Sequence, residues 1–421
     1  MATTALRREI DLESPTRQRV MGLLFLVIGF SIWMFFARHA VPGQVTTFGL
    51  APGGASVTLP DWKIGTGFAL NALALVCAIA GGVQLARGFG RRTNLVLGLV
   101  AGFFIFAFLT FGAADKSLNL GGLLKSSLGK AVPITLGALS GVLCERAAVI
   151  NIAIEGMMLS GAMVGALVGS VSGNLWVGLA AAVATGAFLG LIHGVLSIKY
   201  KTDQIVSGTV INIFATGFTS YIDAKLLQVH QELNNPGFFP RWNLPGLSKI
   251  PFFGPILFEN NLFVYALFIF LIVLTIALFY TRWGLRLRSV GEHPRAADTL
   301  GIDVIRTRYM AVILGGMMAG FAGGYFTLGS VGRFDEVMTG GRGFIGLAAM
   351  IFGNWTPVGS FGAGLLFGFA DALAAKIAIL GVRIPSQFLL MAPYVATMIV
   401  LAGVVGRGQM PAADGQPYEK E

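Results

Sequence analysis

Charged side chains are scarce in this sequence. Asp, Glu, Lys and Arg make up 12% of its 421 residues, about half the share found in ordinary soluble domains. Hydrophobic residues make up 55%, and the mean hydropathy is +0.75. A soluble protein of this size could not cover so much apolar surface with so little charge. The composition therefore excludes a soluble enzyme and a disordered protein, and it favours a membrane protein.

Cysteine and histidine are also rare. The two cysteines, Cys77 and Cys144, lie in or beside apolar runs, so we expect neither a structural disulfide nor a disulfide-stapled secreted domain. The four histidines are far apart in the sequence and do not form the His/Asp/Glu cluster that a metal site or a membrane-embedded enzyme needs. We therefore predict no metal ligands and no catalytic residues.

The net charge of +10 comes from basic residues in short patches between apolar runs, a pattern typical of the flanks of membrane spans. A nucleic-acid-binding face would require these residues to be clustered, so we expect no nucleic-acid partner. The sequence also lacks an ATP-binding motif. Gly341 to Gly346 fits the pattern G-x-G-x-x-G, but it does not follow a strand. We therefore expect this chain to bind no cofactor, and any ATP to be bound by another chain.

Long apolar runs fill most of the sequence. A membrane-spanning helix needs about 20 mostly apolar residues. Windows of that length predict an all-α polytopic membrane bundle of about 10 to 12 spans, of which we take twelve. They lie at 20–36, 65–86, 93–111, 131–144 (short), 155–172, 174–198, 204–223, 261–280, 309–328, 344–356 (short), 358–380 and 386–405.

Basic residues favour the cytoplasmic side of a membrane. Alternating the sides from a cytoplasmic N-terminus places more of them inside than outside, which puts both termini in the cytoplasm. No small-residue cleavage site follows the first apolar run, so we interpret it as an uncleaved span. The outside segment 224–260 is rich in proline and aromatic residues, which predicts an ordered loop or short helices. We divide the chain into an N-terminal extension with three spans (1–115), a core (116–406) and a polar cytoplasmic tail (407–421) that we expect to be disordered.

Polar residues interrupt the apolar sequence between two predicted spans of the core. Glu145, Arg146 and Asn151 lie there, followed by Glu155. A buried charge costs several kcal/mol inside a membrane, and unwound backbone is tolerated there only where protein or a water-filled cavity satisfies it. Two interpretations remain open. One is a broken helix at mid-depth, with which many transporters build a substrate site; the other is a cytoplasmic turn in which Glu145 and Arg146 are solvated.

Four further polar groups lie inside predicted spans. Asn212 either lines a polar path or hydrogen-bonds between helices. Asp371 and Lys376 are five residues apart on one helix and poorly placed to face each other, so each would pair with another helix or extend toward the membrane surface. His193 lies on an apolar, glycine-rich helix, and we interpret it as a packed histidine.

A basic stretch joins the eighth and ninth predicted spans. Pro294 can begin a short helix there, and Gly301 can end it. Ala296, Ala297 and Leu300 would give this helix an apolar side, for which a solvated loop has no use. We therefore predict a docking surface for a soluble partner on the cytoplasmic side.

Several stretches of the core together resemble a known family. The sequence is similar to the permease subunits of bacterial ABC importers of the branched-chain amino acid, ribose and nucleoside type, over roughly 120–405. Within that family, the versions of the first two stretches look most like the nucleoside branch. The stretches that carry the resemblance are 145–157, 203–212, 283–302 and 339–355, continued by 385–394.

The resemblance implies a transport subunit rather than an enzyme, embedded in the lipid of the bacterial inner membrane and carrying nucleosides. It implies a cytoplasmic ATPase subunit, a second homologous permease and a periplasmic or lipid-anchored solute-binding protein as partners. The N-terminal extension departs from the family pattern and has no implied role. The substrate path would lie near Asn151, Glu155, Asn212 and Arg342. Coupling to the ATPase would use Gly291, Glu292, Pro294, Ala296, Ala297 and Gly301.

Two other functions remain open. A simple-sugar permease of the same family is the nearer alternative. An ion-coupled secondary transporter would need several ionisable residues at mid-span, and Glu155, Asp371 and Lys376 are the main candidates here. A non-transporting scaffold would leave both the polar interruption and the docking helix without a purpose.

Overall fold

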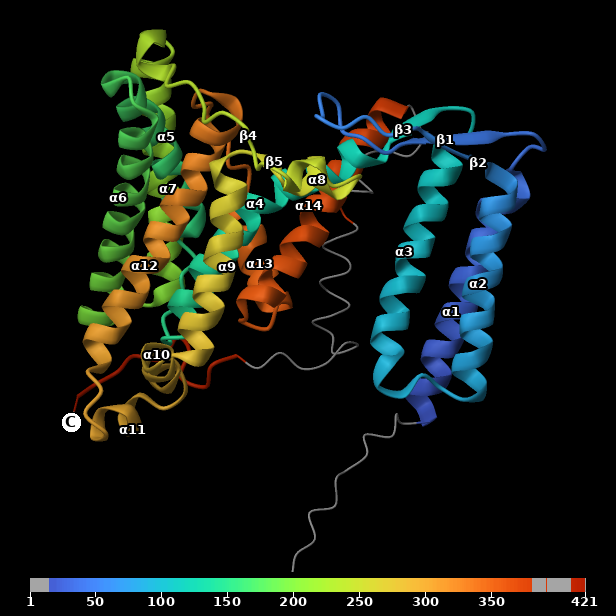
Figure 1. Ribbon diagram of the computed structural model, residues 1–421. Helices are drawn as coiled ribbons and strands as arrows, with labels where there is room; N and C mark the ends of the chain where they lie inside the picture. The colour runs from blue at the N-terminus through green and yellow to red at the C-terminus, as the bar shows by residue number, and fades with distance from the viewer. Residues whose placement is uncertain (1–14, 381–390, 392–409, 421) are drawn as a thin grey trace, which may run out of the picture. The chain divides into compact units, whose positions relative to one another are not determined.

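The computed structural model describes residues 15–380, 391 and 410–420. These form two compact units: the described parts of Met1–Gly122 with Ile377–Ile384, and of Leu123–Lys376 with Pro385–Glu421. Both units are mainly helical (Figure 1). All the residues predicted for the substrate path and for docking lie in the second unit.

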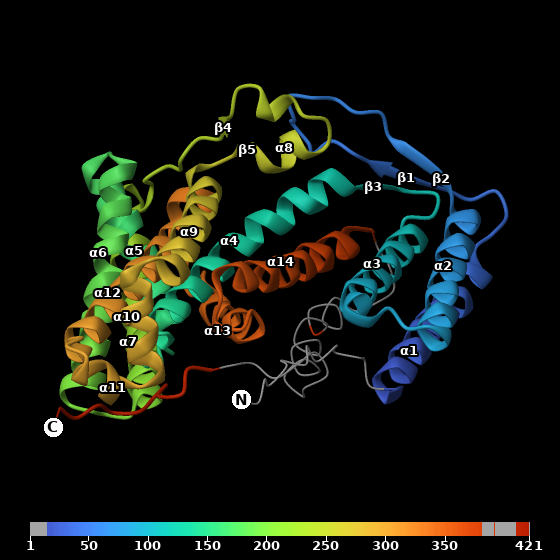
Figure 2. The same cartoon turned by 60° about the horizontal axis from the view of Figure 1, so that its bottom comes forward.

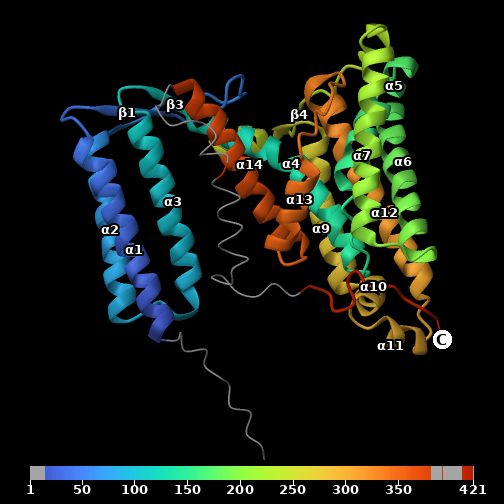
Figure 3. The same cartoon turned by 180° about the vertical axis from the view of Figure 1, so that it is seen from behind.

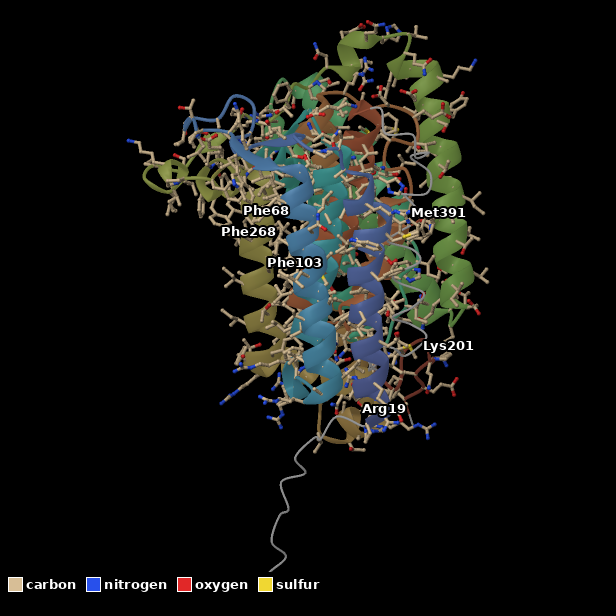
Figure 4. All side chains as sticks on the ribbon, turned by 90° about the vertical axis from the view of Figure 1, so that its right-hand side faces the viewer. Arg19, Phe68, Phe103, Lys201, Phe268 and Met391 are labelled. Carbon is tan, nitrogen blue, oxygen red and sulfur yellow. The ribbon has the colours of Figure 1, made fainter. Side chains whose placement is uncertain are left out.

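The first unit contains three long helices that pack around a shared apolar core, which includes Phe25, Leu70 and Val100. Their outer faces are apolar as well. Phe68 of α2, labelled in Figure 4, is 81% exposed, as suits a side chain that faces lipid. The helices are α1 (Pro15–Phe35), α2 (Thr66–Ala86) and α3 (Thr93–Gly112), with short 3-10 turns at Ala37–His39 and Gly90–Arg92.

A small sheet lies at one end of these three helices. Its strand order is β2-β1-β3, with β1–β2 antiparallel and β1–β3 parallel. Val45 lies opposite Gly65, and Thr47 opposite Ser117. Phe48 of β1 stacks on a ring of α3, which anchors the sheet to the helices. The strands are β1 (Val45–Gly49), β2 (Trp62–Gly65) and β3 (Ser117–Asn119).

The second unit is a bundle of long helices. Figures 1 and 3 show α5, α6, α7 and α12 running side by side. Three of the helices end in a π-helical turn, at Val195–Lys199 after α6, Asp223–Leu227 after α7 and Tyr325–Val331 after α12. The long helices are α4 (Leu120–Glu145), α5 (Ile154–Ser172), α6 (Leu175–Gly194), α7 (Gln204–Ile222), α9 (Leu262–Tyr280), α12 (Val304–Gly324), α13 (Arg342–Phe352) and α14 (Pro357–Leu380).

Glycine lets two of these helices approach closely. A β-carbon on Gly186 of α6 would overlap the carbonyl oxygen of Gly316 and would lie 2.7 Å from Gly320 Cα, both in α12. Because lipid is as apolar as the helix surfaces, close packing rather than hydrophobicity holds such helices together. Gly186, Gly316 and Gly320 therefore mark a close contact between α6 and α12 in this unit.

Ten helices among the described residues are long and apolar enough to cross a membrane, which confirms the predicted polytopic α-helical bundle. The run 131–144 is part of the longer α4, which has 26 residues. The predicted span was too short because the lysines and the proline of this helix lower the mean hydropathy of a 20-residue window. The predicted span 344–356 is wrong. α13 has 11 residues, about 16 Å at 1.5 Å per residue against a core about 30 Å thick. The predicted span 386–405 lies outside the described residues.

The segment 224–260 contains short structured pieces, as its composition predicts. A 3-10 turn covers Gln231–Asn234 and a second covers Leu247–Lys249, while β4 pairs antiparallel with β5. The remaining elements of this segment are α8 (Phe253–Leu257), β4 (Trp242–Asn243) and β5 (Glu259–Asn260).

Two short helices cover the opposite end of the bundle, which Figure 2 brings forward: α10 (Arg282–Glu292) and α11 (Pro294–Thr299), here called the α10–α11 hairpin. Pro294 begins α11, and Gly301 follows it with φ +80°, which confirms the predicted short helix. The expected disorder of the tail is wrong for residues 410–420, because backbone and side-chain hydrogen bonds hold this segment against the hairpin.

Candidate transport site

The chain leaves helical geometry between α4 and α5, at residues 146–153, here called the break. Most of the break is buried, and Ala148 has φ +63°. Glu145, which precedes the break, is 6% exposed and accepts a hydrogen bond from Trp355 Nε1. Arg146 Nε donates to Trp355 O at 2.9 Å. Since neither side chain is simply solvated, the structure supports a broken helix over a solvated turn.

Side chains satisfy the backbone of the break. Gln204 Oε1 accepts from Ile150 N at 2.7 Å, and His193 Nε2 lies 2.9 Å from Ile150 O. A carbonyl only accepts, so Nε2 carries a ring proton, and in a neutral ring Nδ1 accepts from the Ser207 hydroxyl, which lies 3.1 Å away. His193 is thus a packed histidine, as predicted. Buried unwound backbone persists in a membrane where such partners exist.

Asn212 connects the break to the middle of α7. Its Oδ1 accepts from Gly156 N at 2.7 Å, and its Nδ2 donates to Ile152 O at 2.8 Å. Asn212 lies about 12 Å from the start of α7, at 1.5 Å per residue. α5 therefore starts well inside the bundle, and the interhelical hydrogen-bonding interpretation of Asn212 is confirmed.

Asn151 stabilises the break from within. It is fully buried, its Oδ1 accepts from Ala153 N at 3.1 Å, and its Nδ2 lies 3.5 Å from Cys144 Sγ. These contacts hold the turn that leads into α5. They leave the side chain without exposed surface, so in the described conformation it shapes the site rather than lining an open path.

Glu155 caps the N-terminus of α13. The side chain is buried, and its carboxylate accepts from Thr339 Oγ1 at 2.6 Å, Gly341 N at 2.8 Å and Gly343 N at 2.6 Å. The first N–H groups of a helix have no partner within the helix, and its dipole favours a negative charge there. A β-carbon on Gly343 would lie 2.6 Å from Glu155 Cα, so only glycine permits this approach.

Beside this cap, two cations share one carboxylate. Asp371 Oδ2 of α14 accepts from Lys130 Nζ of α4 at 2.9 Å and lies 3.3 Å from Arg342 of α13. The three side chains are between about a quarter and a third exposed. The pairing of Asp371 with other helices rather than with Lys376 is confirmed. Lys130 is not among the residues predicted for the site, because it immediately precedes the predicted span 131–144.

The structure brings together three of the four residues predicted for the substrate path. Glu155 and Asn212 hold either side of the first turn of α5, and Arg342 begins the helix that Glu155 caps. Asn151 lies in the break itself, where it holds the turn that leads into α5. The exposed polar part of this site consists of Lys130, Arg342 and Asp371, which together carry one net positive charge.

The residues predicted to couple to an ATPase lie on the α10–α11 hairpin, where some are packed inside the protein and others are exposed. Gly291 touches the break, since a β-carbon there would overlap Arg146 O, and Ala297 is 2% exposed in an apolar cluster. Glu292 and Ala296 are exposed instead, as is Leu300 at 82%. The hairpin therefore leaves Glu292, Ala296 and Leu300 accessible, while Gly291 and Ala297 are packed inside.

Comparison with known proteins gives the following matches. Residues 123–405 match the family model described as the permease component of the branched-chain amino acid transport system. The guanosine ABC transporter permease protein NupQ of Bacillus subtilis is 40% identical over 304 residues, 70% of this chain and 95% of NupQ. The nucleoside ABC transporter permease protein NupC of Lactococcus lactis is 38% identical over 297 residues, 68% of this chain and 93% of NupC.

A glucose ABC transporter permease protein, TsgB13 of Haloferax volcanii, is 28% identical over 259 residues, 57% of this chain and 66% of TsgB13. No solved structure matches the chain. The matched family region begins at residue 123, so it excludes the first unit's three long helices.

Proposed function

The chain belongs to the family of permease components of the branched-chain amino acid transport system, and from this premise we propose that it forms the membrane path of an ATP-driven importer of nucleosides. It is a multi-pass membrane transport subunit and not an enzyme. The observation that carries the choice of cargo is the 40% identity to a guanosine permease over 95% of that protein's length.

The proposal includes the partners of such a subunit. A separate ATPase would bind the α10–α11 hairpin on the cytoplasmic side of a bacterial inner membrane, where both termini of the chain would lie. A solute-binding protein would deliver the nucleoside from the other side, and a second permease would complete the path. Exposed Leu300 and Ala296 support the hairpin as the ATPase contact.

The contacts suggest how movement of the hairpin reaches the path. Gly291 of α10 touches Arg146 at the start of the break. The break ends at α5, whose first turn carries Glu155, and Glu155 holds the start of α13. Displacement of the hairpin would therefore shift the α5–α13 contact and, with it, Arg342.

The cargo itself requires modest polarity from the path. A nucleoside presents hydroxyl groups and ring nitrogens that both donate and accept hydrogen bonds. The partly exposed Lys130, Arg342 and Asp371 would supply donors and one acceptor close to one another. Selectivity would come from the delivery protein, so this cluster needs only weak contacts with the passing solute.

Uptake of labelled guanosine tests the proposal in cells that express this chain with its partners, against cells that lack this chain alone. We expect uptake that ceases on ATP depletion and survives an uncoupler when ATP is kept constant. Uptake that the uncoupler stops at constant ATP would instead indicate an ion-coupled transporter. Uptake of a labelled simple sugar that requires this chain, without any such uptake of guanosine, would support the sugar-permease alternative, to which the glucose-permease relative points.

A further inference from the structure

The C-terminal segment 410–420, here called the strap, lies across the α10–α11 hairpin (Figure 3). Ala413 N donates to Gly291 O at 3.0 Å. The Tyr418 hydroxyl donates to Asp298 Oδ2 of α11 at 2.7 Å. The Tyr418 ring also packs against an apolar cluster that includes Ala297. The strap thus contacts both helices of the hairpin.

The same strap contacts the break and α12. A β-carbon on Gly415 would lie 2.8 Å from Ile150 Cδ1, so the strap passes close to the break. Gln416 O accepts from Arg308 Nη1 of α12 at 3.0 Å. Asp414 is 8% exposed and lies between Glu145 and Arg308. Hairpin, break and α12 are therefore joined through one segment of eleven residues.

The strap gives a buried charged side chain of α12 a hydrogen-bond acceptor. Arg308 is 2% exposed, and within the part of the chain that the structure describes, Gln416 O accepts from its Nη1, while its Nε and Nη2 have no hydrogen-bond partner. A buried charged donor left without a partner is strongly destabilising. Without the strap, Arg308 would lose this hydrogen bond, and α12 would shift or admit water at the end that carries the hairpin.

The strap also extends to the turn between α6 and α7. Lys201, labelled in Figure 4, pairs with Glu419. Both side chains are well exposed, so this pair is worth little on its own. Its position shows that the strap continues past Tyr418 along the same end of the bundle. The contacts of buried Asp414, of the Gln416 carbonyl and of half-buried Tyr418 hold the segment.

We propose that the strap positions the α10–α11 hairpin against the break, so that movement imposed on the hairpin is transmitted to the start of α5. This inference rests on the proposed function for its source of movement. Tyr418 acts as a positioning residue, because its hydroxyl fixes α11 while its ring fills the cluster between α10, α11 and α12. A hairpin released from the strap could still bind an ATPase and would keep the direct contact of Gly291 with Arg146, but it would lose the contacts through which the strap holds both of its helices beside the break.

The ratio of nucleoside imported to ATP hydrolysed tests the proposal in the complete transporter reconstituted in liposomes. Tyr418→Phe removes one hydrogen bond to a carboxylate and keeps the ring, and we expect the ratio to fall about threefold or more. Asp298→Ala removes the other partner. The double variant should be no worse than either single one, because both delete the same bond. Tyr221→Phe, at an exposed tyrosine at the end of α7, is the matched control.

A purely structural defect would lower import and hydrolysis together and leave their ratio unchanged. A wild-type ratio in Tyr418→Phe and in a chain ending at residue 409 would therefore overturn the proposal. A wild-type complex that imports no nucleoside would overturn the proposed function instead.

Hydrogen exchange on the same purified complexes tests whether the strap holds the hairpin against the break, and this test does not depend on which solute the complex transports. We expect Tyr418→Phe to speed amide exchange in 146–151 and 294–299 by about threefold or more, and Tyr221→Phe to leave it unchanged. Unchanged exchange in both segments after Tyr418→Phe would contradict the strap independently of any transport result.

Discussion

Replacing Glu155 by glutamine should weaken the link between α5 and α13. The carboxylate accepts three short hydrogen bonds, two of them from backbone N–H groups at the start of α13. Glutamine has nearly the same shape but only one acceptor oxygen, and its NH₂ group would face a backbone donor. At least one N–H, that of Gly341 or Gly343, would therefore lose its acceptor inside the protein.

The cost follows from these contacts. Hydrogen bonds to charged groups contribute about 1.5–3 kcal/mol each, and a buried donor left unsatisfied costs about 1–3 kcal/mol. One lost bond at this buried position predicts destabilisation of about 2–3 kcal/mol. Thermal unfolding of the purified chain in detergent measures this, together with nucleoside uptake by the assembled transporter. The exposed Glu232→Gln is the matched control and should change neither.

Gly343→Ala provides an independent route to the same defect. Its added carbon would meet the Glu155 backbone at 2.6 Å and would force α13 away without changing any charge. We expect it to lower both stability and uptake at least as much as Glu155→Gln. A Glu155→Gln variant that unfolds at the wild-type temperature and transports normally would refute the cap as the link between these helices.

Three further predictions concern other parts of the chain. Asp371→Asn removes the carboxylate that Lys130 and Arg342 share, and it should reduce nucleoside uptake more than it reduces binding of the ATPase. Asp335→Asn, at an exposed aspartate, is the control. Equal uptake by both variants would argue against a role of Asp371 in the path. Leu300→Asp should release the ATPase in copurification while the chain still inserts, and full retention of the ATPase would contradict the docking surface. Burial raises the pKa of Asp414 to about 6 from an ordinary value of 3.8, and Glu145 and Arg308 lie beside it. The folded state therefore favours the protonated form of Asp414, so the stability should fall as the pH rises from about 4 to about 6 and level off above. In Asp414→Asn, thermal unfolding should lose most of that decline, whereas an unchanged pH profile would show that Asp414 does not cause it.

Much of the architecture follows from hydropathy and local chemistry. Long apolar runs predict most of the membrane-spanning helices correctly, because a spanning helix must be apolar over about 20 residues whatever its neighbours are. Pro294 and Gly301 marked α11, since each acts within a few residues of itself. The polar residues from Glu145 to Glu155 likewise indicate the position of the break, because they interrupt the apolar sequence at that point.

The contacts that define the site could not be obtained in this way. Lys130 and Asp371 are 241 residues apart, and only the packing of α4 against α14 brings them together. Thr339, which hydrogen-bonds to Glu155, is 184 residues away from it in the sequence. The strap was misjudged because its own composition is polar, while its stability comes from buried partners elsewhere, such as Arg308.

The α13 error has a different cause. The run 344–356 is apolar, but its composition does not reveal that the helix stops at Gly353 and that Asn354 and Trp355 take positive φ angles. That early stop turns Trp355 toward Glu145. A short apolar helix inside a bundle can therefore resemble a membrane span until its end is seen.

ATP-dependent import of guanosine into liposomes measures the central claim most directly. The purified chain would be reconstituted with its partner permease, solute-binding protein and ATPase, and compared with the same proteoliposomes lacking only the ATPase. We predict import that requires both the ATPase and ATP, and none without them. Import of equal rate by the chain without the ATPase would contradict the assignment of this chain as the passive membrane path of an ATP-driven transporter.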